Sequence, residues 1–111
     1  MTAALTKPYR LFTNADMSAT LTSSAVDVSR LIYGSVSLWW TGTPNGTITA
    51  EAQNGDAPWI ALTGFSQSAG LNSGSALFLF TILPYEKIRI KYTLLSASPG
   101  VLNAVFVAKG Y

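Results

Sequence analysis

The chain has 111 residues, which is enough for one domain with a single hydrophobic core. Its net charge of +2 and its pI of about 9.1 are too slight for a nucleic-acid binder, which carries a dense basic surface. Charged residues make up 11% of the chain, against about 25% in typical domains, and hydrophobic residues make up 49%. So few charges indicate that part of the surface is covered in an oligomer or a larger assembly.

The composition also excludes several kinds of site. The chain contains no cysteine and no histidine, so it has no disulfides, no thiolate metal ligands and no imidazole to act as a base near neutral pH. The first ten residues lack the apolar run of a signal peptide, and no segment has the length of a membrane span. We therefore expect synthesis in a host cytoplasm and no membrane partner.

Residues 1–14 are expected to form an N-terminal arm, followed by a single domain over residues 15–111. Pro8 disfavours helix in the residue before it, and the apolar residues of the arm have no long periodic context. These apolar residues are Tyr9, Leu11 and Phe12. We predict that the arm stays outside the sheets and becomes ordered when it docks on a partner through these side chains.

In the first half of the chain, alternation of apolar and polar residues predicts four strands. They cover residues 16–24, 25–32, 33–41 and 47–53, with a break at the two serines between the first and the second. The core-facing residues of the last two strands are expected to be Val36, Leu38, Trp40, Ile48, Ala50 and Ala52. Trp39 is expected on the outer face. A turn joins these two strands through Pro44 and Asn45-Gly46, since Asn-Gly tolerates the positive φ of tight hairpins.

The second half predicts four more strands and one loop. The strands cover residues 59–62, 76–83, 87–93 and 101–108, and residues 63–75 are expected to be a polar, glycine-rich surface loop. In the third of these strands Ile88, Ile90 and Tyr92 face the core, and Lys87, Arg89 and Lys91 face outward. This basic stripe is either an ordinary solvated face or a surface for an acidic partner.

Residues 76–83 are apolar on both faces, although an antiparallel sheet in a small domain normally has one wet face. One set of side chains, namely Phe78, Phe80 and Ile82, is expected in the core. The other set, namely Leu77, Leu79 and Leu83, is then left without a core. We therefore predict that Leu77, Leu79 and the outward Trp39 contact a partner, and that the chain forms a homodimer or a higher homo-oligomer.

About eight regularly spaced strands, without a helix of ten residues or more, predict an all-β fold. The strand spacing favours a jelly-roll-like antiparallel β-sandwich over a barrel or an α/β fold.

Little in the sequence predicts chemistry. The carboxylates are scattered, at Asp16, Asp27, Glu51, Asp56 and Glu86, and their spacing identifies no pair of the kind that glycosidases use. A calcium site near Asn54 and Asp56 would lack a third acidic ligand. A serine nucleophile would need a base, and the lysines are expected to face solvent or to lie at the C-terminus. We therefore predict no enzymatic activity, no metal site and no cofactor.

Three tryptophans leave a binding interpretation open. Trp39, Trp40 and Trp59 could stack on sugar rings as a glycan-binding platform. The alternative is that they fill the core or an interface, which is the expectation for Trp40.

Four segments carry a resemblance to a known family. They are Trp-Thr-Gly-Thr-Pro-Asn-Gly-Thr at residues 40–47, Glu-Ala-Gln-Asn-Gly-Asp-Ala-Pro-Trp at residues 51–59, Lys-Ile-Arg-Ile-Lys-Tyr-Thr at residues 87–93 and Gly-Val-Leu-Asn-Ala at residues 100–104. In motif order and chain size the sequence resembles the tailed-phage capsid decoration proteins, also called cement or staple proteins, such as those of the epsilon15-type short-tailed phages. The resemblance covers about residues 33–111.

The resemblance implies a virion protein with a jelly-roll-like fold on the outer surface of an icosahedral head. Such a protein would form dimers at two-fold positions, bind the major capsid protein and clamp neighbouring coat subunits. It implies no catalytic residues. A glycan-binding module of a virion and a small component of the tail or baseplate are the alternatives.

Overall fold

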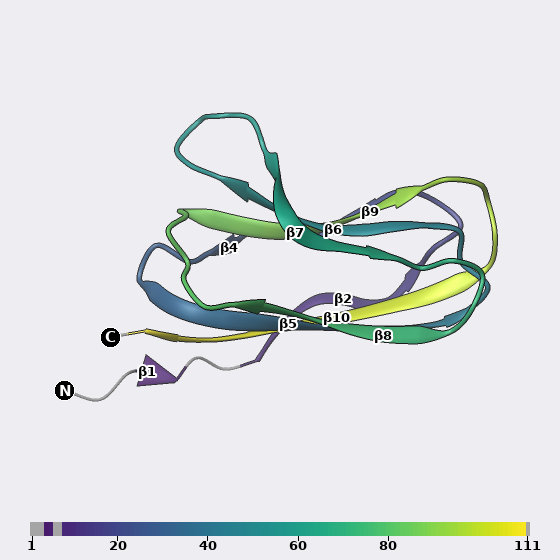
Figure 1. Cartoon of the computed structure of the whole chain (residues 1–111), viewed down its shortest axis with the longest axis horizontal. Coiled ribbons are helices and arrows are strands. Elements are labelled where there is room, and N and C mark those ends of the chain that lie inside the picture. Colours follow the sequence, from purple (N-terminus) through teal and green to yellow (C-terminus); the bar gives the residue numbers. More distant parts are fainter. Residues whose placement is uncertain (1–3, 6–7, 111) are drawn as a thin grey trace.

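The computed structural model describes residues 4, 5 and 8–110, which form ten β-strands and no helix (Figure 1). The strands are β1 (Ala4–Leu5), β2 (Tyr9–Asp16), β3 (Leu21–Thr22), β4 (Val26–Asp27), β5 (Leu31–Gly42), β6 (Gly46–Gln53), β7 (Ile60–Ser68), β8 (Gly74–Phe80), β9 (Lys87–Leu94) and β10 (Gly100–Gly110). In this part of the chain no helix exists that could cross a membrane.

The strands form two antiparallel sheets that lie as two layers (Figure 1). Sheet A has the order β2, β10, β5 and β8, with β1 beside the far end of β10. Sheet B has the order β3, β9, β6 and β7, with β4 also beside β9. The chain crosses between the sheets at most of its connections, as in a jelly roll. The predicted all-β sandwich is therefore confirmed.

The inner faces of the two sheets form one hydrophobic core, and the predicted alternation is confirmed in its central strands. The inward residues that the sequence predicts in β5, β6 and β9 are all buried; they are Val36, Leu38, Trp40, Ile48, Ala50, Ala52, Ile88, Ile90 and Tyr92. From β10 the core receives Leu102, Ala104, Phe106 and Ala108. Strict alternation explains this agreement, because successive side chains of a strand point to opposite faces.

The expected N-terminal arm is wrong for residues 9–14. These residues belong to β2, which pairs with β10 and places Leu11 and Phe12 in the core, 6% and 8% exposed. Pro8 lies just before the strand, where its missing N–H costs no ladder hydrogen bond. The remaining positions of the expected arm include residues 1–3, 6 and 7, which lie outside the described part of the chain.

The two strands expected at residues 16–24 and 25–32 are shorter than predicted. Asp16 accepts a hydrogen bond from the N–H of Ser18, and Asp27 accepts bonds from the hydroxyl and N–H of Ser29. Each aspartate thereby closes a local turn, and these bonds hold both carboxyl pKa values below their usual range. Only β3 and β4 remain as pairings with β9.

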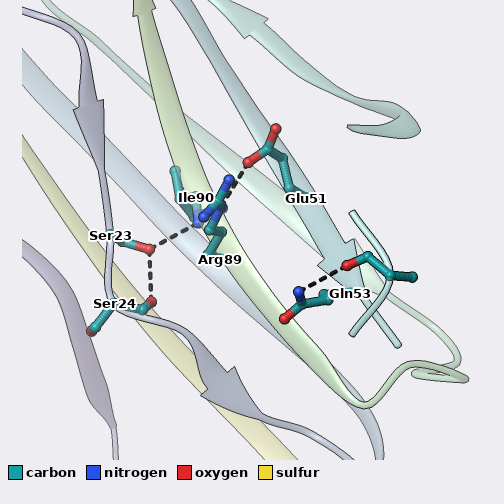
Figure 2. A network of polar contacts seen from close by, with 7 residues as sticks. Ser23, Ser24, Glu51, Gln53, Arg89 and Ile90 are labelled. Carbon is teal, nitrogen blue, oxygen red and sulfur yellow. Dashed lines mark hydrogen bonds and ion pairs between the residues drawn. The ribbon is translucent and has the colours of Figure 1, made fainter. Parts of the chain in front are cut away.

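Between β3 and β4 the pairing with β9 continues at Ser23, through one backbone hydrogen bond and one bond to the serine side chain. The N–H of Ser23 donates to the carbonyl of Ile90, and the N–H of Ile90 donates to the Ser23 hydroxyl, each at 2.9 Å. The same hydroxyl donates to the Ser24 carbonyl (Figure 2). The predicted break at the two serines is thus confirmed.

The expected loop over residues 63–75 is wrong at both ends. β7 runs to Ser68 and β8 begins at Gly74, so the loop between them is short. Phe65 draws the segment onto the core, since its ring stacks on Phe80 with centroids 4.5 Å apart. β8 also ends sooner than predicted, at Phe80, and the alternation stops there.

The end of β8 reverses the expected positions of two residues. The loop that follows the strand buries Leu83 and leaves Ile82 exposed, against the prediction.

Tyr92 lies completely buried where β9 faces the start of β6. A Cβ on Gly46 would come within 2.6 Å of the Tyr92 ring, so glycine is required there by close approach. The Tyr92 hydroxyl is buried without a hydrogen-bond partner in the described part of the chain. Burial raises the pKa of this phenol. The nearby backbone of Asn45 offsets part of this shift, although it makes no hydrogen bond of normal geometry to the hydroxyl.

We predict that Tyr92→Phe leaves the free energy of unfolding at pH 7 unchanged or raises it by about 1 kcal/mol, because an unpaired buried hydroxyl is removed. Since the folded-state pKa of Tyr92 lies above the unfolded value, its ionisation leaves the free energy of unfolding unchanged below about pH 10, and above that pH ionisation of the unfolded chain lowers it. Urea titrations from pH 7 to 11 should therefore show a shallower alkaline loss of stability for the variant. A loss of more than about 1 kcal/mol at pH 7 would contradict the prediction.

Candidate interaction surface

The outer face of sheet A is built by register between three strands. In one row Val105 of β10 lies opposite Ser37 of β5, which lies opposite Leu77 of β8. The next row holds, in the same order, Val107, Ser35 and Leu79. The serine in the middle of each row has a short side chain, so it projects less from the sheet than its apolar neighbours on either side. Two rows of similar composition therefore lie side by side.

Aromatic residues of β5 extend this surface along the strand. Tyr33 and Trp39 are 41% and 37% exposed, while Leu77 and Leu79 are 60% and 58% exposed. We call the surface formed by Tyr33, Trp39, Leu77, Leu79, Val105 and Val107 the apolar face. Isolated exposed leucines are common, but several apolar side chains on one sheet face indicate a contact surface.

The scarcity of charge strengthens this interpretation. β5, β8 and β10 together contain one charged residue, Lys109, which lies opposite Tyr33 at the margin. A second cation, Arg10 of β2, lies over the Trp39 ring at 5.2 Å from its centroid. Its guanidinium also donates to the Asn103 side chain at 3.4 Å. Cations therefore border the apolar face.

The outer face of sheet B is polar. Arg89 of β9 donates to Glu51 of β6 at 2.7 Å, and both side chains are largely buried (Figure 2). The same guanidinium lies 4.2 Å from the centroid of the Trp59 ring. Arg89 is thus held by an ion pair and a cation–π contact within the molecule. Lys87 lies opposite Asp27 in the strand register and contributes to lowering the pKa of that carboxyl.

The structure separates the residues that the sequence proposed as one partner interface. Trp39, Leu77 and Leu79 lie together on the apolar face. The stripe of Lys87, Arg89 and Lys91 lies on sheet B, on the other side of the sandwich.

The three apolar residues expected in the arm lie elsewhere. Leu11 and Phe12 belong to the core, so they are not surface contacts. Tyr9 is exposed and lines a pocket of about 330 Å³ between β2, β4 and β10, where its hydroxyl lies 3.4 Å from that of Ser24.

Sequence reasoning missed Tyr33, Val105 and Val107. The signal was present, because residues 104–108 are apolar on both faces just as residues 76–80 are. What the sequence could not show is that β5 lies between these two strands and joins their outer faces.

The described residues contain no group of three or more acidic side chains close enough to hold a metal ion.

Comparison with known proteins identifies a fold and no family. No protein-family model matches this sequence, and no curated protein is similar to it. The crystal structure of the SPBc2 prophage-derived protein YomS is similar, with a TM-score of 0.65 and 13% identity over 99% of this chain and 96% of that one. The PBSX exported protein XepA is also similar, with a TM-score of 0.60 and 11% identity. This chain is covered to 99% in that comparison and spans 37% of XepA.

We predict that the apolar face contributes little to the fold. Leu79→Thr should change the free energy of unfolding by about 0.5 kcal/mol or less, because the side chain is 58% exposed and threonine suits a strand. The same change at Leu38, which is 1% exposed on the neighbouring strand, should cost about 3 kcal/mol. Urea unfolding at low protein concentration measures both, and equal losses would mean that Leu79 supports the fold.

Proposed function

We propose that this chain is a non-enzymatic structural protein of a phage particle. It decorates the outside of the icosahedral head and holds neighbouring coat subunits together. The observation that carries the proposal is the apolar face, a nearly charge-free outer surface on a folded sheet that has a buried core behind it.

The similar structures support a phage setting. YomS is described as prophage-derived and XepA as an exported protein of PBSX. At 13% and 11% identity the likeness itself is one of fold. The neighbours share a phage setting with the capsid decoration proteins that the sequence resembles; the decoration role itself is supported by that resemblance and by the apolar face.

The shape of the molecule suits attachment to a shell. Its Cα extents are 47 × 28 × 21 Å, so it is a slab whose broad sides are the outer faces of the sheets. Placed with sheet A down, it covers a seam between two coat subunits and leaves the polar face of sheet B in water. Apolar burial at the seam favours the assembled shell over its separated subunits, because binding to one state stabilises that state.

The position of β2 changes how the clamp would work. An arm of fourteen residues was expected to wrap a neighbouring subunit, but residues 9–14 are fixed in sheet A. Attachment therefore relies on the rigid apolar face, which loses little conformational freedom when it binds.

Glycan binding is the alternative, and the tryptophans do not form a platform for it. Trp40 is buried, Trp39 lies on sheet A, and Trp59 lies in the loop just before β7; the rings of Trp39 and Trp59 are far apart in the fold, and each lies against an arginine. A component of the tail or baseplate remains an alternative location, which electron cryomicroscopy of the native particle would distinguish from the head surface.

We predict that Val105→Lys weakens attachment to coat shells of the encoding phage at least about tenfold, or about 1.4 kcal/mol, because it buries an ammonium within the apolar face. Co-sedimentation of protein with shells that lack it measures the affinity. Thr49→Lys, which places the same charge on β6 in sheet B, should bind like the wild type. Equal binding by all three proteins would contradict attachment through sheet A.

A further inference from the structure

Every open sheet ends in two strands whose outer N–H and C=O groups have no neighbouring strand. Such edges pair with other chains unless charges, prolines, bulges or interruptions prevent it. In sheet A the edges are β8 and the β1–β2 side. In sheet B they are β7 and the β3–β4 side.

Three of these four edges are protected. β2 follows Pro8, contains Arg10 and Asp16, and pairs with β10 through two register shifts. β3 and β4 have two residues each and are interrupted by residues 23–25. β7 pairs with β6 through a register shift, and its Gly64 has a φ of 87°. An added strand would meet a charge, a bulge or a gap on each of them.

The β8 edge has no such protection. Its sequence, Gly-Ser-Ala-Leu-Phe-Leu-Phe, contains no charge and no proline. All seven residues pair with β5 in unbroken register, from Gly74 opposite Trp40 to Phe80 opposite Gly34. Within the described part of the chain β8 pairs with β5 alone. Short apolar segments of this composition readily pair with copies of themselves.

We infer that β8 pairs with β8 of a second copy, antiparallel about a two-fold axis, so that two A sheets join into one continuous sheet. The inference follows from the edge itself and does not rest on the proposed function. A two-fold axis brings each residue near it against its own counterpart, so a charge there would face the same charge. A charge-free strand meets this requirement.

The strand also determines the register of the pair. With the axis at Leu77, the middle residue, all seven residues of β8 are paired. Leu77 then lies opposite the partner's Leu77, and Ser75 lies opposite the partner's Leu79. Outward residues stay opposite outward residues, whereas a slip by one would set Leu77 against the inward Phe78.

The first test uses the self-pairing of position 77. Sedimentation equilibrium should show the wild type at twice the 11.8 kDa mass of one chain. Leu77→Lys and Leu77→Asp should each raise the dissociation constant at least about tenfold, because like charges would lie directly opposite each other. Mixed in equal amounts, the two variants should form a heterodimer, since the paired charges are then opposite. Leu77 is 60% exposed, so both variants should fold.

Two control variants separate edge pairing from other modes of association. Val105→Lys lies in the same row as Leu77 but two strands away from the edge, so it should leave the dimer intact. If two copies instead packed apolar face against apolar face, Val105→Lys would disrupt that dimer. Leu95→Lys, 80% exposed after β9, should also remain dimeric.

The second test is disulfide trapping, for which the cysteine-free chain is well suited. Leu77→Cys should form a linked dimer in a glutathione buffer, because directly opposite residues have Cα atoms about 4.5–5.5 Å apart. Leu79→Cys should not link to itself, since the two positions would lie about 14 Å apart along the strands. A mixture of Ser75→Cys and Leu79→Cys should link.

Several results would overturn the inference. One is a wild-type protein that is monomeric at about 100 μM. This result would count against the inference even if coat shells bind to β8. Another is a mixture of Leu77→Lys and Leu77→Asp that forms no heterodimer. A third is an equal yield of disulfide-linked dimer for Leu77→Cys and Leu79→Cys. Because Val105→Lys should weaken shell attachment and preserve the dimer, this inference and the proposed function can fail separately.

Discussion

The pairing of β10 along its length organises the rest of the molecule. One side of β10 pairs with β5 over eleven positions, and the other side pairs with β2 and β1. This arrangement anchors the N-terminal residues in the sheet, so Leu11 and Phe12 become core instead of contacts. It also sets Val105 and Val107 beside β5 and, across it, beside Leu77 and Leu79 of β8. The core and the apolar face therefore depend on the same strand pairings.

Local alternation allowed much of the fold to be predicted. Residues 36–40, 48–52 and 88–92 point as their sequence indicates, because a strand with one buried face encodes its own orientation. The failures have local causes. Asp16 and Asp27 end strands by capturing nearby N–H groups, and Phe65 adds a polar segment to sheet B by stacking on the core. Such effects override periodicity.

The candidate interaction surface was predictable only in part. Trp39, Leu77 and Leu79 could be identified as outward apolar residues from alternation alone. Their proximity depends on which strands are neighbours, and strand order is a long-range property that periodicity does not contain. The basic stripe was a poor indicator of a binding surface, again because long-range neighbours are not visible in the sequence. Arg89 is predicted to face solvent, but it pairs with Glu51 and lies against the Trp59 ring.

The apolar face and the β8 edge would make different demands on a partner. The face would accept any apolar surface of suitable shape, whereas the edge would accept only an extended backbone in a defined register. Because they meet at Leu77 and Leu79, pairing through the edge would place two apolar faces side by side on one sheet. Two joined faces would bind a two-fold seam with an affinity that one face cannot reach, since the second contact would form at high effective concentration. A geometry of this kind would let weak apolar contacts stabilise a shell without the charges that this chain lacks.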